Sequence, residues 1–344
     1  MVTLKDIAEK TGFSQSTVSI VLRGLSEERH IPDETRIRIQ ETARSLGYTP
    51  NTSAKRLRSV TAVKTIAIFW ANDFRREMVA HFFQGVYQYM LKNAPEYEII
   101  ICPYNPGKLD EAVSAVRLSM YAGCIVCNAA ENDLAYLDGL DTLCPIVVYN
   151  RPSERYSYVQ VDNTDIGKCA ARELVRDGCG HLVLISDRMA FPYLISRARG
   201  FEEAGKEEGL VVETILTRDP SIIIGRDLAG TVLHALGHTG PDGKPLRTGI
   251  FICSSDQTTF GLVSGLNDLD VHFPQDVSLI TVGTGSDALY ACFLPKLSVI
   301  QIPLEQMAEA CAGRIHEMIE HRETAQKKVT VPFRYVQGNT TRNR

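Results

Sequence analysis

The chain has 344 residues, of which 44% are hydrophobic and 23% are charged, and its formal net charge is −4. This length exceeds one ordinary hydrophobic core and predicts two or three domains of globular type. The sequence has no long uninterrupted apolar stretch and no basic N-terminal segment followed by an apolar one, which argues against a membrane-spanning or exported protein and predicts a cytoplasmic one.

The charge is unevenly divided along the chain. Residues 1–60 hold ten Lys and Arg against seven Asp and Glu, a balance of +3, which leaves −7 for the remainder. This asymmetry is modest, but it fits a small polyanion-binding head joined to an acidic body.

Residues 3–22 predict two short helices separated by a tight turn. Thr3 is a favourable helix N-cap with Asp6 in the first turn, and Gly12 can take the left-handed conformation that ends a helix. Ser14 is the N-cap of the second helix. Apolar residues repeat at helical spacing on one side of each helix, namely Leu4, Ile7 and Ala8, then Val18, Val21 and Leu22. This is the pattern of a helix-turn-helix.

A third helix is predicted from about Asp33 to Leu46, because Ile39, Ala43 and Leu46 repeat at i, i+4 and i+7. Three helices of this size bury little surface, so the head should be only marginally stable alone. On this pattern alone, the alternative is a generic three-helix cap or dimerisation module.

The strings T-L-K-D-I-A, G-F-S-x-S-T-V-S, P-D-E-T-R, L-G-Y-T-P-N and A-K-R-L follow one another within residues 3–57. Together they closely resemble the head of the lactose-repressor (LacI/GalR) family of bacterial transcription regulators. The resemblance implies a transcriptional repressor whose homodimer binds a pseudo-palindromic DNA operator. It also implies that helix 14–22 lies in the major groove.

The resemblance implies a set of DNA-contacting residues. Gln15, Ser16 and Ile20 would face base edges, and Ser14, Thr17 and Ser19 would be placed for phosphate contacts, which position without specifying. The remaining DNA-binding candidates are Thr3 and the hinge residues Asn51, Ala54, Lys55, Leu57 and Arg58. Leu57 would act as an apolar wedge in the minor groove.

Two departures from the family pattern affect base contacts. Ile20 stands where a polar or basic side chain is common, which favours contact with a thymine methyl group. The loop 25–31 is also longer than usual.

Beyond residue 60, short apolar runs alternate with helical stretches, which predicts parallel sheets covered on both faces. The number of runs indicates two doubly wound subdomains. The runs are 65–70, 97–102, 123–127, 145–149, 158–162, 181–186, 209–216, 248–253 and 276–282.

The run 123–127 contains Cys124 and Cys127, the only closely spaced pair among nine cysteines. A zinc or redox pair is an alternative, but i and i+3 of a strand point to opposite faces, so small core residues are favoured.

The later strings V-D-N (161–163), R-x-x-G-F (197–201), S-D-x-x-x-x-G (255–261), P-Q-D-V-S-L-I (274–280) and P-K-L-S-V-I-Q-I-P (295–303) resemble the same family. The resemblance implies a periplasmic-binding-protein-like core. The expected domains are a helix-turn-helix at 1–48, a hinge helix and linker at 49–60, and an effector-binding and dimerisation core at 61–344. Within the core, we expect an N-subdomain of about 61–161 plus 292–322 and a C-subdomain of about 162–291 plus 323–344.

Polar residues follow many of the predicted strands, at the sheet edge where doubly wound folds bind ligands. Each alone could instead be a helix cap or turn residue. Together they suit a polyhydroxyl ligand such as a sugar or sugar derivative. By resemblance, Arg197 and Asp256 are the strongest effector-binding candidates. The others are Asp73, Phe74, Asn150, Arg151 and Asp162.

Two positions depart from the family here also. Asn150 stands where an aspartate is frequent, and Thr281–Thr284 replaces a segment that usually carries acidic residues, so a common sugar cannot simply be assigned.

Catalytic motifs are absent: the sequence has no nucleophile elbow, Walker A, H-E-x-x-H or dinucleotide fingerprint. The G-x-G within residues 281–286 lacks the third glycine of a nucleotide-binding loop, and the eight histidines do not cluster at metal-ligand spacing. We therefore predict no enzyme, no catalytic residue, no cofactor and no metal site. The alternatives are an exported sugar-binding receptor and an enzyme built on a doubly wound fold.

Overall fold

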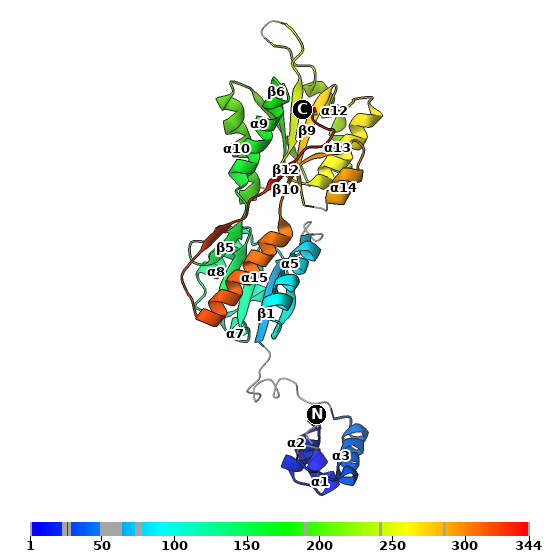
Figure 1. Ribbon diagram of the computed structural model, residues 1–344, viewed down its shortest axis with the longest axis vertical. Helices are drawn as coiled ribbons and strands as arrows, with labels where there is room; N and C mark the ends of the chain where they lie inside the picture. Colours follow the sequence, from blue (N-terminus) through cyan, green and yellow to red (C-terminus); the bar gives the residue numbers. More distant parts are fainter. Residues whose placement is uncertain are drawn as a thin grey trace. The chain divides into compact units, whose positions relative to one another are not determined.

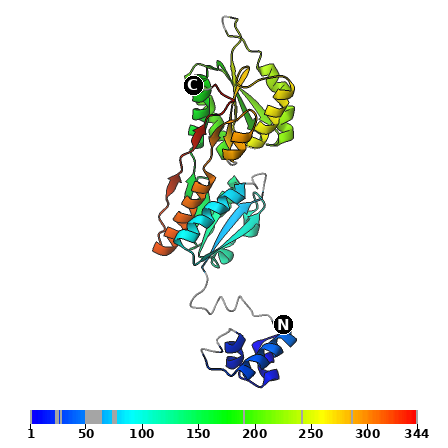
Figure 2. The same cartoon turned by 45° about the vertical axis from the view of Figure 1, so that its right-hand side comes forward.

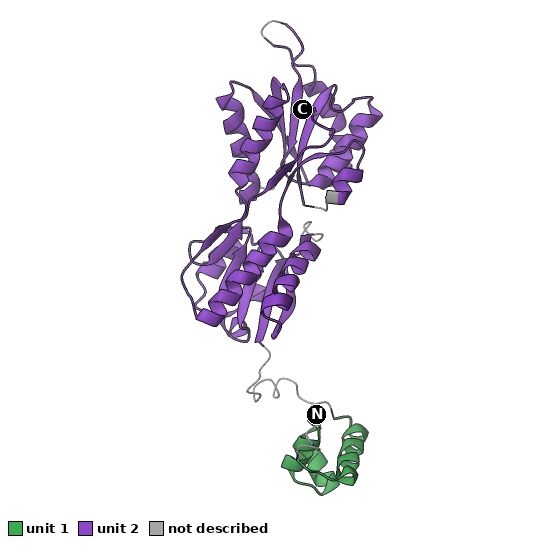
Figure 3. Cartoon of the chain, viewed as in Figure 1, with its two compact units in different colours: residues 1–63 green, residues 64–344 purple. Residues whose placement is uncertain are grey.

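The computed structural model describes residues 2–22, 26, 29–48, 64–72, 78–188, 191–240, 243–284 and 287–342. The chain divides into two compact units, residues 1–63 and 64–344 (Figure 3). The predicted hinge at 49–60 lies outside the described residues, and with it the five hinge candidates Asn51, Ala54, Lys55, Leu57 and Arg58. No helix in the described residues is both long and apolar enough to cross a membrane.

The first unit is the predicted three-helix head, with α1 (Leu4–Thr11), α2 (Gln15–Leu22) and α3 (Asp33–Ser45). Its first helix begins with a capping box: the Asp6 backbone N–H donates to the Thr3 hydroxyl, and the Thr3 backbone N–H donates to the Asp6 carboxylate at 2.7 Å. Gly12 ends the helix with φ of 78°, in the left-handed region that favours glycine. The turn predicted from Thr3, Gly12 and Ser14 is confirmed.

The head has a small core in which all three helices take part. Its buried members are Ile7, Ala8, Val18, Val21, Ile39 and Ala43. These are six of the nine apolar residues that the helical spacing predicted, and the other three, Leu4, Leu22 and Leu46, pack against them partly buried. A core of this size fits a marginally stable domain.

The second unit begins with a six-stranded sheet (Figure 1). Its strand order is β11-β5-β4-β3-β1-β2, and all its strand pairs are parallel. The strands are β1 (Lys64–Ala71), β2 (Tyr97–Tyr104), β3 (Gly123–Cys127), β4 (Ile146–Tyr149), β5 (Ser157–Gln160) and β11 (Lys328–Thr330). The helices are α5 (Met78–Asn93), α6 (Leu109–Ala112), α7 (Ala115–Leu118), α8 (Glu131–Asp138) and α15 (Leu304–His321). Figure 2 shows α5 and α15 lying side by side against this sheet.

A second six-stranded sheet follows in the order β12-β10-β9-β8-β6-β7, with β12 antiparallel to β10 and the other pairs parallel. The strands are β6 (His181–Asp187), β7 (Val212–Thr217), β8 (Thr248–Ile252), β9 (Val277–Gly283), β10 (Ser298–Gln301) and β12 (Arg334–Val336). The helices are α9 (Asn163–Arg176), α10 (Pro192–Glu207), α11 (Ile222–Asp227), α12 (Ala229–Ala235), α13 (Asp256–Asp268) and α14 (Asp287–Cys292).

The predicted fold class, a helical head followed by two doubly wound parallel-sheet subdomains, is confirmed. The strand pairing differs from the subdomain boundaries expected near the C-terminus. Strand β10 pairs with β9 in the second sheet, although 292–322 was assigned to the first subdomain, and β11 pairs with β5 in the first sheet, although 323–344 was assigned to the second. Short strands carry no pattern that specifies which distant edge they join, so the sequence could not settle these pairings.

The two cysteines on β3 are residues of the hydrophobic core. Cys124 and Cys127 are both fully buried, and they belong to two different apolar clusters on opposite faces of the sheet. The face alternation of a strand places them there, as predicted.

Glycines let neighbouring helices of the second subdomain approach closely. A Cβ on Gly167 of α9 would lie 2.0 Å from the carbonyl oxygen of Arg197, and one on Gly200 of α10 would lie 2.0 Å from that of Thr164. The same arrangement joins α11 and α13, where a Cβ on Gly261 would lie 1.9 Å from the Ile222 oxygen. Only glycine permits these backbone contacts, which fix the helices relative to one another.

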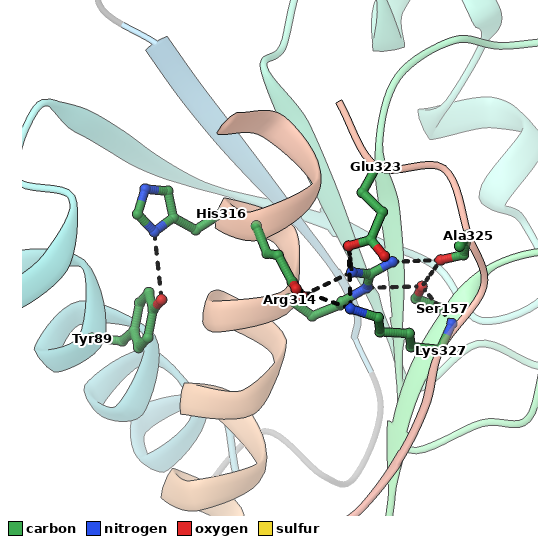
Figure 4. A network of polar contacts seen from close by, with 8 residues as sticks. Tyr89, Ser157, Arg314, His316, Glu323, Ala325 and Lys327 are labelled. Atoms are coloured by element: carbon green, nitrogen blue, oxygen red, sulfur yellow. Dashed lines mark hydrogen bonds and ion pairs between the residues drawn. The ribbon is translucent and has the colours of Figure 1, made fainter. Parts of the chain in front are cut away.

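The chain passes between the two sheets three times: after β5, between β10 and α15, and between β11 and β12. A polar network holds the connection between α15 and β11, which precedes the third passage, to the first sheet (Figure 4). The side chain of Arg314, on α15, is only 2% exposed and donates to Ser157 at 3.2 Å, to Glu323 at 2.6 Å and to the carbonyl of Ala325. Lys327 adds ion pairs to Glu323 and to Glu317, which also pairs with Arg314.

Candidate nucleic-acid interface and ligand cavity

The outer face of α2 is the candidate nucleic-acid interface. Gln15 and Ser16 are exposed and Ile20 is partly exposed, whereas Val18 and Val21 on the other side are buried in the head core. The three predicted base-facing residues therefore lie on the side of the helix that the core leaves open. Short polar side chains on an exposed helix are suited to the major groove.

Two of the three predicted phosphate-contacting residues, Ser14 and Thr17, take part in local capping. The Thr17 backbone N–H donates to the Ser14 hydroxyl at 3.1 Å, and the two hydroxyls lie 2.9 Å apart. Thr3 likewise caps α1 through its side chain. These bonds fix the helix N-termini, whose backbone N–H groups and positive dipole ends attract phosphate.

A cavity of about 610 Å³ lies between the two sheets of the second unit. Its walls come from the carboxyl ends of β4, β8 and β9, from the first turns of α5, α11 and α13, from α10, and from the passage between β10 and α15. Its lining residues are Met78, Asn150, Tyr193, Arg197, Pro220, Ser221, Ile222, Ile223, Ser254, Ser255, Asp256, Gln257, Thr284 and Ile302. The volume lies in the usual range for small-molecule sites.

Arg197 forms one wall of the cavity and is only 4% exposed. Its guanidinium donates to the Asn163 side-chain oxygen and to the Cys253 carbonyl, both at 2.9 Å, and stacks over the Tyr193 ring at 4.9 Å. Burial lowers the pKa of this group, although an arginine remains charged. Within the described part of the chain, no carboxylate lies in ion-pair distance of Arg197, so its charge is available to an oxygen-rich or anionic ligand.

Asp256 lies on another wall, at the start of α13, and is 7% exposed. Its carboxylate accepts a hydrogen bond of 2.5 Å from the Tyr290 hydroxyl, and the backbone N–H and hydroxyl of Thr284 approach it at 3.4 Å. A carboxylate held in this way retains acceptor capacity for ligand hydroxyl groups.

Asn150 reaches the cavity from the first sheet, directly after β4. Its backbone takes φ of 56°, the left-handed conformation that asparagine tolerates better than most residues. Its side-chain oxygen is buried and has no hydrogen-bond partner among the described residues. Because buried acceptors are nearly always satisfied, this atom is a candidate to accept from a ligand.

The structure thus brings Arg197, Asp256 and Asn150 into one cavity, and it places two other predicted residues elsewhere. Arg151 is 1% exposed and does not line the cavity. It donates to the carbonyls of Ala129 and Asn150 and contacts the ring of Tyr193, a lining residue. Asp162 is exposed and caps α9 by accepting from the backbone of residue 165. Its position after a strand reflects helix capping, the alternative that sequence alone left open.

Asp73 and Phe74, the remaining predicted effector-binding residues, lie outside the described residues.

Sequence reasoning missed the apolar part of the lining. Ile222 and Ile223 are 49% and 74% exposed at the start of α11, and Met78 and Ile302 line the cavity from other elements. Two adjacent isoleucines that a fold leaves exposed at a cavity are a signal for ligand contact, but their exposure is known only from the structure.

Comparisons with known proteins agree with this architecture. The model for bacterial regulatory proteins of the lacI family matches residues 3–51, and the model for a periplasmic binding protein-like domain matches residues 171–341. The HTH-type transcriptional regulator RegA of Clostridium saccharobutylicum is 24% identical over 347 residues, which cover 98% of this chain and 99% of that protein.

Two solved structures show the same fold over almost the whole chain. The lac repressor dimer bound to operator and the anti-inducer ONPF has a TM-score of 0.72 at 17% identity and covers 99% of each chain. The complex of the transcriptional regulator CelR with cellobiose has a TM-score of 0.66 at 19% identity and covers 99% of this chain and 100% of that one. The chain belongs to the LacI family of DNA-binding transcriptional regulators, which are not enzymes, and combines a helix-turn-helix head with a periplasmic-binding-protein-like effector domain.

Proposed function

We propose that the protein is a repressor that binds a pseudo-palindromic operator as a homodimer and responds to a small oxygen-rich metabolite, a sugar or sugar derivative, in the cavity between its two sheets. The observation that carries the proposal is the cavity itself. It joins a buried arginine, a buried carboxylate and an unsatisfied amide oxygen to an aromatic ring and several aliphatic side chains. Polar groups and apolar faces of this kind suit a carbohydrate.

Each polar candidate has a distinct role in this proposal. Arg197 offers its charged guanidinium to a carboxylate or to neighbouring hydroxyls, and Asp256 accepts hydrogen bonds from hydroxyls. Of these three residues, Asn150 is the one that reaches the cavity from the first sheet. A ligand that contacts all three bridges the two subdomains. Its affinity therefore differs between open and closed arrangements, which is the condition for a population shift.

DNA binding would use both heads of the dimer. Gln15, Ser16 and Ile20 would face base edges, with Ile20 favouring a thymine methyl group. The hinge residues, among them the proposed minor-groove wedge Leu57, would engage only when the two cores hold the hinges at the right separation. The structures of the lac repressor with operator and of CelR with cellobiose, both similar in fold to this chain, support both halves of the proposal.

The test begins with selection of an operator from random duplex DNA by the full-length protein, and a thermal-shift screen of the same protein against sugars, sugar acids and sugar phosphates. A deletion of residues 2–60 should lose operator binding and keep the ligand-induced shift. Operator binding that survives the deletion would exclude the head as the DNA-binding domain.

Point variants separate the two sites. Arg197→Met and Asp256→Asn should abolish the response of operator binding to the ligand while leaving operator binding intact. Leu57→Ala should weaken specific binding while sparing non-specific binding. An unchanged ligand titration in both cavity variants would place the effector elsewhere, and equal losses of specific and non-specific binding in Leu57→Ala would exclude the wedge.

A further inference from the structure

Two histidines and a glutamate converge at the amino-terminal end of the second sheet, away from the ligand cavity. His181 begins β6, Glu213 lies on the neighbouring strand β7, and His238 follows α12. Their ligand atoms all lie within 4.8 Å of one another. The cavity lies at the carboxyl ends of the strands, so the two places are separate. Figure 1 shows the loop between α12 and β8 at the end of this sheet that faces away from the first sheet.

The distances within this triad, defined as His181, Glu213 and His238, are informative. The Glu213 carboxylate lies 3.6 Å from Nε2 of His181 and 3.4 Å from Nε2 of His238. Both distances exceed the usual 2.7–3.2 Å of an N–H···O hydrogen bond. Ligand atoms at about 2.0–2.1 Å from a tetrahedral zinc ion are separated from one another by roughly 3.4 Å. The two Glu213 distances are close to this spacing, and the two histidine nitrogens lie within 4.8 Å of each other.

A further contact orients the buried histidine. Nδ1 of His181 lies 3.2 Å from the Thr248 hydroxyl, so an N–H at Nδ1 can donate to that oxygen and leave Nε2 as the bare nitrogen that faces Glu213. Metal-binding histidines are characteristically held by such a bond from the second ring nitrogen.

We propose that this triad binds one divalent transition-metal ion, with zinc the best match to two imidazoles and one carboxylate. The side chain of His181 is 4% exposed, whereas those of Glu213 and His238 are 41% and 51% exposed. The open side leaves a coordination position for water or for an exogenous donor. The sequence predicted no metal site because the three residues are far apart along the chain, and only the pairing of β6 with β7 and the return of the chain after α12 bring them together.

The ion would tie a surface loop to the sheet. The chain after His238 folds back on itself, with a bridge between Thr239 and Pro245 and a hydrogen bond of 2.8 Å from Leu246 N–H to the His238 carbonyl. Binding would therefore fix this loop to β6 and β7. Because the ion binds only the folded arrangement, it would also raise the unfolding temperature of the protein.

The test is calorimetric titration of the full-length, reduced protein with Zn²⁺, together with Co²⁺ binding followed by visible absorption. We expect one saturable site whose affinity falls at least tenfold in His238→Ala and in Glu213→Gln, both partly exposed positions that tolerate substitution. Thr248→Val should weaken binding by about 10–100-fold while keeping all three ligands.

His234→Ala is the matched control, because this exposed histidine lies on α12 four residues away and outside the triad. It should leave affinity and the Co²⁺ spectrum unchanged. All variants keep the nine cysteines, so thiolate-bound metal would persist equally in each. Absence of a saturable site, or equal affinity in the His238→Ala and His234→Ala proteins, would overturn the proposal.

Discussion

Substitution of Gly167 by alanine tests how the wall that carries Arg197 is built. The new methyl group would lie 2.0 Å from the carbonyl oxygen of Arg197 and 2.6 Å from the backbone nitrogen of Phe201. Both neighbours are backbone atoms of α10, so no side chain can rotate away. Helices α9 and α10 must part by about 1.4 Å, the difference between 2.0 Å and the 3.4 Å at which ordinary contact begins.

The expected cost follows from two opposing effects. Overpacking of a rigid contact destabilises a protein by about 1–3 kcal/mol. Replacing a helical glycine by alanine contributes roughly 0.5–1 kcal/mol in the opposite direction. We therefore expect a net loss of about 1–2 kcal/mol. Parting the helices also stretches the 2.9 Å bond between Arg197 on α10 and Asn163 on α9, so ligand binding should weaken as well.

Urea unfolding followed by far-ultraviolet circular dichroism measures the first effect, with a lowered midpoint and an unchanged slope expected. Gly230→Ala on α12 is the matched control, because an added Cβ there meets nothing within 4 Å and φ lies outside the strained range. It should be neutral or stabilising by up to about 1 kcal/mol. Equal midpoints for the Gly167→Ala and Gly230→Ala proteins would refute the close-contact argument.

The double variant Gly167→Ala/Gly200→Ala gives a second check. Each methyl group separates the same two helices, so the cost of the pair should be less than the sum of the two single costs. If the two losses of unfolding free energy add fully, each contact relaxes independently of the other and the helices do not move as rigid bodies.

Three further predictions concern other contacts. Thr3→Ala removes the capping hydroxyl of α1 and should destabilise the head by about 0.5–2 kcal/mol, measurable by hydrogen exchange of its amides. Tyr290→Phe removes the 2.5 Å bond to Asp256 and should cost about 1–3 kcal/mol in urea unfolding. Hydrogen bonds from Lys327 and then Arg314 lower the pKa of Glu317 to about 2. The stability that these bonds contribute to the folded protein is fully present above the unfolded pKa near 4.5 and is lost as pH falls toward 2. The stability difference between wild type and Lys327→Met should therefore shrink over that pH range.

Local signals in the sequence predicted local structure well. Thr3, Gly12 and Ser14 marked the helix ends of the head because caps depend on a few neighbouring residues. The apolar runs located strands β1 to β9 but not the short strands β10, β11 and β12. The position after a strand or within a family motif located Asn150, Arg197 and Asp256 at one cavity. In each case the determining residues are adjacent or follow a simple period.

Features that depend on distant pairing were not predictable in the same way. The sequence could not indicate that β11 returns to the first sheet, that Ile222 and Ile223 stay exposed at the cavity, or that His181, Glu213 and His238 meet. Asp162 illustrates a further ambiguity: its position after a strand suggested a ligand contact, and the structure shows that one carboxylate oxygen caps a helix. A polar residue after a strand has both uses, and only the direction of its side chain distinguishes them.

The distribution of close backbone contacts bears on how a ligand could alter the protein. In the second subdomain glycines lock α9 to α10 and α11 to α13, and in the first a Cβ on Gly85 of α5 would lie 2.3 Å from the Glu305 oxygen of α15. Helices locked in this way move together with their sheet, so each subdomain should behave as a rigid body. The subdomains can then move relative to each other only by changes in the three passages between the sheets. Because Asn150 and Arg197 face the cavity from different subdomains, a ligand that contacts both acts directly on the angle between them.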